Sequence, residues 1–450
     1  MTQDAIDHVL RSQNPWWVSG AGVVRGGAGR ARPFDVQLQD DARPLLLAGP
    51  RRAGKTAALL RLVETRLRDG AGLPETGYCD LGHALLRSEP LGAVVDRLLR
   101  LMDAPERPWV LLDGLQAVPD WPVRLRELID TRPHAHFVAA SSVAPEGHEL
   151  AYDVVRVPPL RFREQCALRG LPELGAPPLD PMALELPAQS DDADDYLFDR
   201  VLDPLLADYL VRGGFPEAVL PSDPAEGRAR VREGVAARAI YEDLPSVVHV
   251  LTQADLDRVL VAVLQHGSAP LAVEAMSGAL GLTSSTLGRY IDHLERCFLL
   301  HTLRNFAATT ERSRPRLFPA DPALPNAFFE RGAEVLAQPE ARIELLRAAI
   351  VDHLSHYASQ RGFDLAYFRE GDLEADVVLV TPEGPLPILL FDREELGDEE
   401  VARVDRLMKR MEVRRAIVLS RARRRRREAL TFFDSVDHLP VSYFLYALVT

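Results

Sequence analysis

The chain contains the sequence PLLLAGPRRAGKT at residues 44–56, in which an apolar run leads directly into a glycine-rich loop. The apolar run suits a buried parallel strand. The loop, Gly49 to Thr56, fits the pattern G-x-x-x-x-G-K-[ST], which cradles phosphates when it joins a strand to a helix. The residues that follow it show helical apolar spacing and a glycine suited to a helix C-terminus; these are Leu59, Val63, Leu67 and Gly70. This order predicts a P-loop.

A P-loop predicts a site for ATP, or a closely related nucleoside triphosphate, together with Mg²⁺. The loop glycines let the backbone curl so that its N–H groups face phosphate oxygens, and the helix N-terminus favours the same negative charge. Lys55 should reach the β- and γ-phosphates, and the Thr56 hydroxyl should ligate Mg²⁺. Lys55 is one of only two lysines, the other being Lys409. The expected nucleotide-binding residues are Gly49, Pro50, Arg51, Arg52, Ala53, Gly54, Lys55 and Thr56.

Three further apolar runs predict strands at residues 77–81, 108–114 and 136–142. The second run ends in Asp113, as the strand that carries a Walker B aspartate does, and Asp113 is therefore expected to hold Mg²⁺ directly or through water. The third run ends in Ser141 and a second serine, where a polar side chain can sense the γ-phosphate. An aspartate or a serine can also simply end a strand, and this alternative stays open for both residues.

Gly114 follows Asp113, whereas hydrolysing ATPases of this general kind usually have a glutamate there that orients the attacking water. Glycine can neither accept a proton nor position a water molecule. Gln116 and Asp120 are nearby polar residues, but neither stands at the expected place. The sequence therefore predicts intact nucleotide binding and poor intrinsic hydrolysis.

Several motifs occur in a characteristic order, and together they resemble the AAA+-like P-loop ATPases of archaea and bacteria. In that family the ATPase core is followed by a winged helix and by a C-terminal domain of unknown function with a restriction-endonuclease-like core. The resemblance covers nearly the whole chain and is more specific in its first half. The motifs are NPWW (Asn14–Trp17), GPRRAGKT, WVLLDGLQAVPDW (Trp109–Trp121), AASS, PPLRFRE (Pro158–Glu164) and RGGFPEAV (Arg212–Val219).

The sequence departs from the family pattern at two places. The family usually has Asp-Glu where this chain has Asp113-Gly114. It also usually has a Gly-Arg pair before the PLRFRE-like segment, where this chain has Leu150 and Ala151. If that arginine normally completes a neighbouring site, it is missing here. Both departures imply weakened turnover.

The resemblance and the residue patterns together predict an α/β protein with four parts. A winged helix-turn-helix and a degenerate PD-(D/E)XK nuclease-like domain are expected to follow the P-loop core and its helical lid. The acidic run Asp191, Asp192, Asp194 and Asp195 is expected to lie in an exposed insertion. The four parts are the AAA+-like core at 1–170, the insertion and lid at 171–250, the winged helix at 251–305 and the nuclease-like domain at 306–450.

The winged-helix segment has helix–turn–helix spacing, with Gly281 in the turn and a helix from about Ser284 to Cys297 in the recognition position. Residues 255–304 contain five acids against four arginines and no lysine. DNA affinity depends on clustered positive charge, so DNA contact and a pure packing role both stay open. The expected exposed face comprises Ser284, Ser285, Thr286, Arg289 and Tyr290.

The C-terminal part predicts a helix at 347–354, a hairpin at 366–380, and strands at 385–391 and 414–420. This pattern resembles the PD-(D/E)XK nuclease fold, in which a helix glutamate, an aspartate and a Glu-x-Lys pair hold a metal and activate water. Matched residue by residue, the glutamate position is Arg347, the aspartate is Asp376, and the Glu-x-Lys pair is Leu389 and Phe391.

One carboxylate cannot hold a hydrolytic Mg²⁺, which needs several oxygen ligands. The nuclease-like domain is therefore expected to be a scaffold or a binding surface. A relocated site at Asp392 and Glu394 would require the strand to extend that far. Arg421 and Arg423–Arg427 form the strongest positive cluster, which is either a nucleic-acid or acidic-partner patch or a solvated surface.

The composition fits an ordinary globular protein of two to four domains, because 47% of the 450 residues are hydrophobic and 26% are charged. The net charge of −13 argues against a whole surface dedicated to nucleic acid or anionic lipid. Neither a signal peptide nor a membrane helix is evident, so we expect a cytoplasmic protein without membrane contact. The three widely spaced cysteines predict buried, reduced thiols; they are Cys79, Cys166 and Cys297.

We expect an ATP-binding protein with weak or absent hydrolysis that acts as a nucleotide-dependent switch or scaffold, with a protein partner. Two alternatives stay open. An active ATPase could remodel DNA or protein, with Gln116, Asp120 or a partner replacing the missing glutamate. A DNA-binding adaptor could instead use ATP as a structural ligand and contact DNA through the winged helix or Arg423–Arg427.

Overall fold

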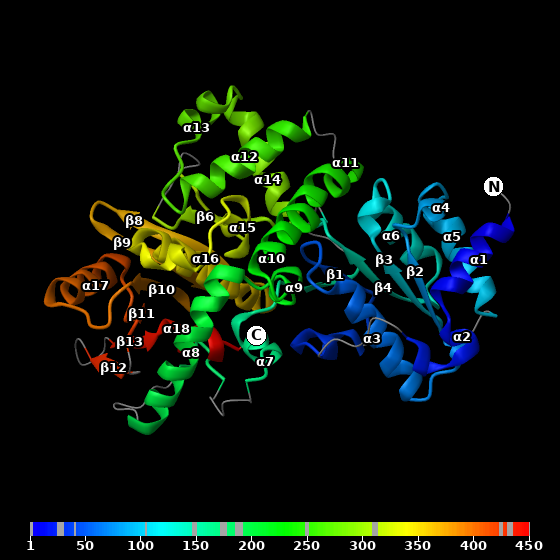
Figure 1. Ribbon diagram of the computed structural model, residues 1–450, viewed down its shortest axis with the longest axis horizontal. Helices are drawn as coiled ribbons and strands as arrows, with labels where there is room; N and C mark the ends of the chain where they lie inside the picture. Colours follow the sequence, from blue (N-terminus) through cyan, green and yellow to red (C-terminus); the bar gives the residue numbers. More distant parts are fainter. Residues whose placement is uncertain are drawn as a thin grey trace. The chain divides into compact units, whose positions relative to one another are not determined.

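The computed structural model describes eleven segments: residues 3–24, 31–39, 42–103, 106–145, 151–171, 178–184, 192–247, 252–307, 314–422, 426–429 and 435–449. The chain divides into two compact units (Figure 1). Unit 1 comprises Met1–Pro159, Glu233–Leu256 and Arg296–Phe298, and unit 2 comprises Leu160–Arg232, Asp257–Glu295 and Leu299–Thr450. The segment Glu233–Leu256 of unit 1 is therefore continued by unit 2 at both of its ends.

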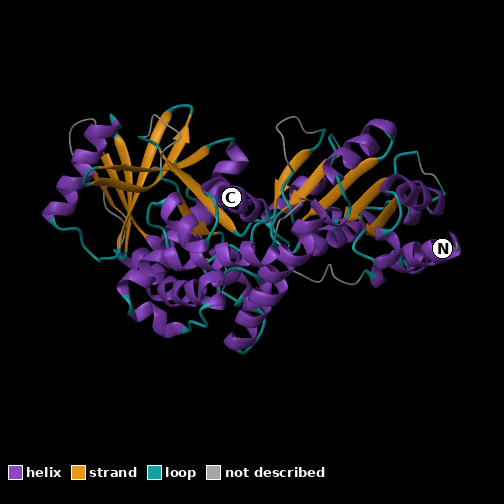
Figure 2. Ribbon diagram, turned by 90° about the horizontal axis from the view of Figure 1, so that it is seen from above, coloured by secondary structure: helices purple, strands orange, loops and turns teal. Residues whose placement is uncertain are grey.

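Unit 1 contains a parallel sheet (Figure 2), in which the P-loop strand lies between β4 and the edge strand β5. The sequence predicts four of its five strands, and all four are confirmed. The fifth, β5, was not predicted. The order is β2-β3-β4-β1-β5, and the strands are β1 (Leu45–Ala48), β2 (Thr76–Asp80), β3 (Trp109–Asp113), β4 (His136–Ser141) and β5 (Asp153–Arg156).

Helices cover both faces of this sheet because successive strand residues point to opposite sides. Leu45 and Leu47 pack with α3 (Lys55–Arg68) and η2 (Pro33–Gln39). Leu46 and Ala48 face the other core, which three helices share, namely α1 (Gln3–Gln13), α5 (Leu91–Leu101) and α6 (Trp121–Thr131). The shorter elements of unit 1 are α2 (Trp16–Ser19), η1 (Ala21–Val23), η3 (Leu73–Glu75), α4 (Ala84–Arg87), η4 (Leu115–Ala117), η6 (Ala239–Asp243) and α11 (Leu244–Val247).

The NPWW motif closes the edge of this sheet at β2. The Asn14 side chain accepts a 2.7 Å hydrogen bond from the Tyr78 N–H and donates a 2.8 Å bond to the Tyr78 carbonyl. The indole N–H groups of Trp16 and Trp17 both donate to the Thr76 carbonyl. These side chains satisfy backbone groups that an open edge strand would leave unpaired.

Unit 2 contains an eight-stranded mixed sheet in the order β12-β13-β11-β10-β9-β8-β6-β7. The predicted hairpin is confirmed as the antiparallel pair β8–β9, and the two predicted strands are confirmed as β10 and β11. The strands are β6 (Leu300–Asn305), β7 (Arg316–Pro319), β8 (Asp364–Glu370), β9 (Leu373–Thr381), β10 (Gly384–Phe391), β11 (Arg415–Ser420), β12 (Arg426–Ala429) and β13 (Ser435–Pro440).

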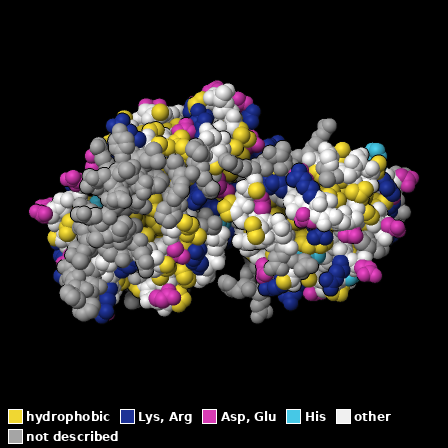
Figure 3. Space-filling view, turned by 90° about the horizontal axis from the view of Figure 1, so that it is seen from below, with side chains coloured by type: hydrophobic (Ala, Val, Ile, Leu, Met, Phe, Trp, Pro, Cys, Tyr) yellow, Lys and Arg dark blue, Asp and Glu magenta, His cyan; other side chains and the backbone are white. Residues whose placement is uncertain are grey.

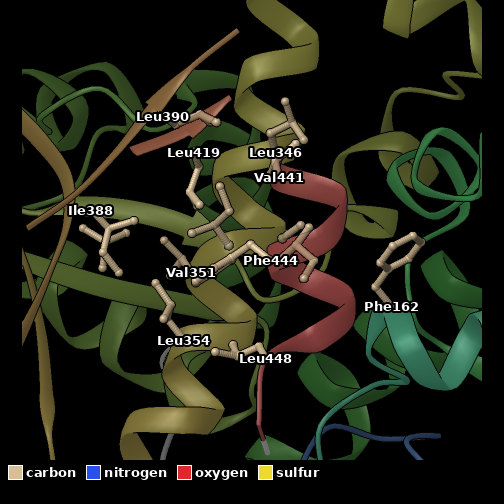
Figure 4. Close-up of a cluster of buried hydrophobic side chains, with 14 of the residues drawn as sticks. Phe162, Leu346, Val351, Leu354, Ile388, Leu390, Leu419, Val441, Phe444 and Leu448 are labelled. Carbon is tan, nitrogen blue, oxygen red and sulfur yellow. The ribbon is translucent and has the colours of Figure 1, made fainter. Parts of the chain in front are cut away.

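The larger core of unit 2 lies between this sheet and four helices. Figure 4 shows two of them side by side, with Leu346, Val351 and Leu354 on one helix and Val441 and Phe444 on the other. The predicted helix at 347–354 is the middle of the much longer α16. The four helices are α7 (Phe162–Leu168), α8 (Asp192–Arg212), α16 (Pro339–Arg361) and α18 (Val441–Ala447), and α17 (Asp398–Met411) packs on the other face.

Helices α13 (Val273–Leu280) and α14 (Ser284–Arg296) form the expected helix–turn–helix, with Gly281 at φ +70° between them. Tyr290 was predicted on the exposed face of α14, and this prediction is wrong because its side chain is only 3% exposed. Tyr290 follows Leu287 by three residues and therefore shares the apolar stripe of the helix. The classification as a winged helix stays a prediction. The remaining elements are α9 (Pro216–Val219), α10 (Pro224–Arg230), the π-helix η5 (Val231–Ala237), α12 (Gln253–His266), α15 (Ala323–Phe328) and η7 (Ala333–Ala337).

The three cysteines are buried and free, as predicted. Within the described part of the chain, no helix combines the length and the apolarity that a membrane crossing requires. On the face that Figure 3 shows, basic and acidic side chains are interspersed over the described residues. Arg423–Arg425 and Asp191 lie outside the described residues, and so do the side chains of Asp192, Asp194, Asp195, Arg426 and Arg427.

Candidate nucleotide-binding site

The two P-loop glycines are required for different reasons. A Cβ atom on Gly49 would lie 2.0 Å from the Val157 carbonyl oxygen, so only glycine lets β1 and the Val157 backbone approach this closely. Gly54 has φ +102°, a conformation that side-chain-bearing residues rarely adopt. Arg52 also lies in the left-handed region, at φ +65°. The loop therefore has the curled backbone that the sequence pattern predicts.

Lys55 begins α3 and points back into the loop. Its Nζ atom donates hydrogen bonds of 2.8 Å to the Gly49 carbonyl and 2.7 Å to the Pro50 carbonyl. The side chain is buried, and this burial lowers the pKa of Lys55 to about 8, although the nearby carboxylates of Asp113 and Asp243 oppose the shift. An anion that reaches this ammonium group would replace two contacts with neutral carbonyl oxygens by contact with a negatively charged acceptor.

The structure brings together the two residues predicted to hold Mg²⁺. The Thr56 hydroxyl donates a 2.6 Å hydrogen bond to Oδ2 of Asp113. Burial raises the pKa of Asp113, and the hydrogen bonds from Thr56 and Tyr78 oppose that shift. A hydroxyl and a carboxylate oxygen at this spacing fit Mg²⁺, which prefers hard oxygen ligands and takes the rest from phosphates and water.

Tyr78 contributes to this site and was not predicted. It lies on β2 beside β3, and its hydroxyl donates a 2.9 Å hydrogen bond to the same Asp113 oxygen. The sequence motifs did not indicate Tyr78, because a tyrosine within an apolar strand is usually a core residue. Its hydroxyl fixes the orientation of the Asp113 carboxylate.

No carboxylate follows Asp113, but one stands next to the vacated position. Gly114 has φ +76°, and a Cβ atom there would lie 3.7 Å from Oδ1 of Asp80. Asp80 is the last residue of β2 and pairs in register with Asp113. The Asp80 carboxylate accepts a 2.9 Å hydrogen bond from the Gly82 N–H. Sequence reading missed Asp80 because it lies 34 positions from Gly114.

The two residues that the sequence offered as substitutes for the glutamate lie elsewhere. Gln116 is an amide, and its Oε1 accepts a 3.2 Å hydrogen bond from the Ser142 N–H at the end of β4. Asp120 is exposed at the start of α6. Leu150 lies outside the described residues, and the neighbouring Ala151 is half-buried.

The two serines at the end of β4 have different surroundings. The Ser141 hydroxyl is fully buried and serves its own turn, since it donates to the Val143 carbonyl and accepts from the Val143 N–H. The Ser142 hydroxyl donates a 2.6 Å hydrogen bond to Oδ2 of Asp243. The geometry thus favours Ser142 over Ser141 as a phosphate sensor, and the role of Ser141 stays a prediction.

Asp243 joins this serine to the P-loop. Its other oxygen, Oδ1, lies 2.5 Å from Nη1 of Arg51, and the carboxylate is buried. Arg51 also pairs at 3.0 Å with the exposed Glu242. Asp243 belongs to a segment 192 residues beyond Arg51, so local sequence patterns could not connect the two.

The C-terminal positions matched to the nuclease pattern also converge, at a cavity of about 430 Å³ in unit 2. Arg347 occupies the position at which the nuclease pattern has a helix glutamate. Its Nε donates a 2.7 Å hydrogen bond to Asp376. Leu389 and Phe391 line the same cavity. The Arg347 guanidinium is therefore a counter-ion of Asp376.

A relocated site at Asp392 and Glu394 would require strand β10 to extend through both residues, and it does not. Strand β10 ends at Phe391, so the two carboxylates do not share a strand face. Asp392 is instead bound by Arg342, with its closest contact at 2.5 Å, and by Arg421 at 3.0 Å.

Two family models match parts of the chain. Residues 41–166 match the AAA domain, and residues 203–334 match a domain of unknown function, DUF8612. Residues 41–166 thus resemble an AAA-type P-loop domain, a nucleotide-binding class. This confirms the first half of the resemblance. Neither match tests the winged-helix or nuclease-like assignment. No curated protein matches the chain.

Several solved structures resemble the chain weakly. C. elegans PCH-2 has 14% sequence identity and a TM-score of 0.27, over 48% of this chain and 63% of that one, which is less than two thirds of its length. AMPPCP-bound DnaA from Aquifex aeolicus has 13% identity and a TM-score of 0.22, over 56% and 82%. VC1899 from Vibrio cholerae has 12% identity and a TM-score of 0.16, over 84% and 88%. TM-scores this low carry no functional conclusion.

Proposed function

We propose that this protein binds ATP with Mg²⁺ and uses the bound state as a conformational switch, with slow intrinsic hydrolysis. The observation that carries the proposal is the convergence of Lys55, Thr56 and Asp113 beside Gly114. The binding groups of a P-loop site lie together, and the position next to Asp113 has no side chain.

Each residue has a distinct part in binding. The curled loop presents backbone N–H groups to the phosphates, and Lys55 leaves the Gly49 and Pro50 carbonyls to neutralise phosphate charge. Thr56 and Asp113 would hold Mg²⁺, which would offset the charge of the phosphates. Ser142 would meet the γ-phosphate at the end of β4. Tyr78 keeps the Asp113 carboxylate oriented.

Slow hydrolysis follows from the missing general base. A positioned base contributes about 10²–10⁴-fold to such a reaction. Gln116 cannot accept a proton in this role, and Asp120 is exposed. Bound ATP would therefore persist, and its γ-phosphate could order the surrounding loops for long periods.

The two lysines offer a matched test. Lys55→Ala is expected to weaken ATP binding at least 100-fold by calorimetry, whereas Lys409→Ala, which removes an exposed pair with Asp405, should leave affinity unchanged. Phosphate release by the wild type should be slow. Equal ATP affinities in all three proteins would overturn the proposal, and fast turnover abolished by Lys55→Ala would overturn its slow-hydrolysis part.

One observation favours a second candidate, an active ATPase. The Asp80 carboxylate lies beside the space that a residue-114 side chain would occupy, so it could accept the proton of the attacking water. Under this candidate Asp80→Asn abolishes an ordinary turnover rate without affecting ATP affinity. Under the switch proposal the variant changes a slow rate little.

A further inference from the structure

We propose that Asp243 is a positioning residue that reads whether the phosphate site is filled and transmits this state to the segment Glu233–Leu256. The inference rests on the proposed function, because it needs a triphosphate at the P-loop. Asp243 lies outside both the P-loop and the Asp113 strand.

One buried carboxylate holds two elements of the site at once. Oδ1 of Asp243 binds Arg51 of the P-loop at 2.5 Å, and Oδ2 binds the Ser142 hydroxyl at the end of β4 at 2.6 Å. The side chain of Asp243 is 5% exposed. Its negative charge is tolerated there because both oxygens have strong partners.

A bound triphosphate competes for the same partners. Its γ-phosphate belongs beside Lys55, and Asp243 is close enough to Lys55 to favour the charged ammonium. Phosphate oxygens would therefore repel the Asp243 carboxylate and attract both the Arg51 guanidinium and the Ser142 hydroxyl. Weakening of these two contacts is unfavourable for a buried carboxylate, so Asp243 is expected to move.

The position of Asp243 in the chain makes such a movement consequential. It ends η6 (Ala239–Asp243), a π-helical turn that directly precedes α11. The π-helix η5 (Val231–Ala237) lies only one residue before η6, so π-helical geometry, which is rare, extends over most of residues 231–243. The segment Glu233–Leu256, which contains η6, is joined to unit 2 at both ends, through Arg232 and Asp257. A shift of Asp243 therefore acts on two covalent connections to unit 2 at once.

Glu242 provides a control built into the structure. It is adjacent in sequence and binds the same Arg51, but its side chain is 49% exposed and its contact is longer, at 3.0 Å. An exposed pair of this kind contributes little. Only the buried carboxylate can report the loss of its partners, so Asp243→Asn and Glu242→Gln should behave differently.

The experiment measures backbone hydrogen exchange in residues 233–247 of the full chain, with Mg²⁺ alone, MgADP and the β,γ-methylene analogue of MgATP. In the wild type the analogue should change exchange at least threefold relative to MgADP, and Glu242→Gln should retain this difference. Asp243→Asn should lose it while binding the analogue about tenfold more tightly, because one like charge is gone. Ser142→Ala should reduce the difference.

The outcomes separate the inference from the proposed function. If the wild type binds no nucleotide by calorimetry, the proposed function fails and the inference with it. If nucleotide binds but residues 233–247 exchange equally in all states, or if Asp243→Asn keeps the wild-type difference, the inference alone is overturned. Circular dichroism and the measured affinity establish that each variant is folded.

Discussion

The Tyr78 hydroxyl lies 2.9 Å from Oδ2 of Asp113, the oxygen that also accepts the Thr56 hydroxyl. Two donors from β2 and α3 thus hold one carboxylate oxygen and leave Oδ1 free of both. A carboxylate held in this way presents a fixed oxygen to a metal, because groups that hydrogen-bond to a metal ligand fix its orientation.

Tyr78→Phe removes one of these donors and keeps the ring. We expect the affinity for MgATP to fall by about three- to tenfold, while the affinity for ATP in EDTA stays unchanged, because only the metal depends on the Asp113 orientation. Calorimetry with and without Mg²⁺ checks this. Equal losses in both conditions would mean that Tyr78 acts through packing alone.

The pH dependence of ATP binding should follow Lys55. Its pKa of about 8 means that the ammonium is charged below pH 8 and loses its proton above it. A bound phosphate favours the charged form, so binding above pH 8 must take up a proton. Affinity should fall up to tenfold per pH unit from 8 to 10.

Lys55→Arg serves as the control for this titration, since a guanidinium stays charged throughout. Its affinity is expected to be lower at pH 7 but flat up to pH 10. A flat profile for the wild type would show that Lys55 remains charged up to pH 10 without bound nucleotide.

Gly114→Glu alone should not restore fast hydrolysis. The residue has φ +76°, which costs a side chain about 1 kcal/mol or more, and the new carboxylate would lie against Asp80. The double variant Gly114→Glu/Asp80→Asn removes the like charge and keeps the Gly82 contact. We expect it to hydrolyse ATP at least tenfold faster than either single variant.

Steady-state phosphate release at saturating MgATP checks this comparison. If Gly114→Glu alone is as fast as the double variant, Asp80 does not constrain position 114. If Asp80→Asn alone abolishes a substantial wild-type rate, the second candidate function is favoured instead.

Sequence reasoning located the parts of the nucleotide site that are local along the chain. The P-loop, its strand and its helix are contiguous, so spacing alone predicted them. Strand β5 was not predicted because only Val155 of its four residues is buried, so its sequence shows no alternation of apolar and polar residues. Tyr290 was wrongly predicted to be exposed, because the polar residues near it in α14 suggest a surface position for an amphipathic side chain. Asp80 and Asp243 reach the site only through sheet register and tertiary packing.

Arg347 should stabilise unit 2 through Asp376. Arg347→Met leaves the Asp376 carboxylate with the Leu390 N–H as its remaining described partner, and we expect a loss of about 3 kcal/mol in unfolding free energy. Arg410→Met removes an exposed pair with Glu370 and should cost below about 1 kcal/mol. Urea denaturation checks both, and the Arg347→Met/Asp376→Leu variant should recover most of the loss.

Equal costs for Arg347→Met and Arg410→Met would contradict this account, because the two ion pairs would then be equivalent. Failure of the double variant to recover would place the contribution of Arg347 in its 2.9 Å contact with Glu344 rather than in Asp376.

The threading of the chain between the units bears on how the protein is made. Strands β1–β5 are complete by Arg156, yet unit 1 also contains Asp243 and the buried pair Cys297 and Phe298. A ribosome must therefore synthesise 298 of the 450 residues before the whole nucleotide-binding unit exists. Since domains tend to fold as they emerge, unit 1 can be completed only after part of unit 2 has also been translated. A fragment that ends at Pro159 would lack Glu233–Leu256 and Arg296–Phe298 of unit 1.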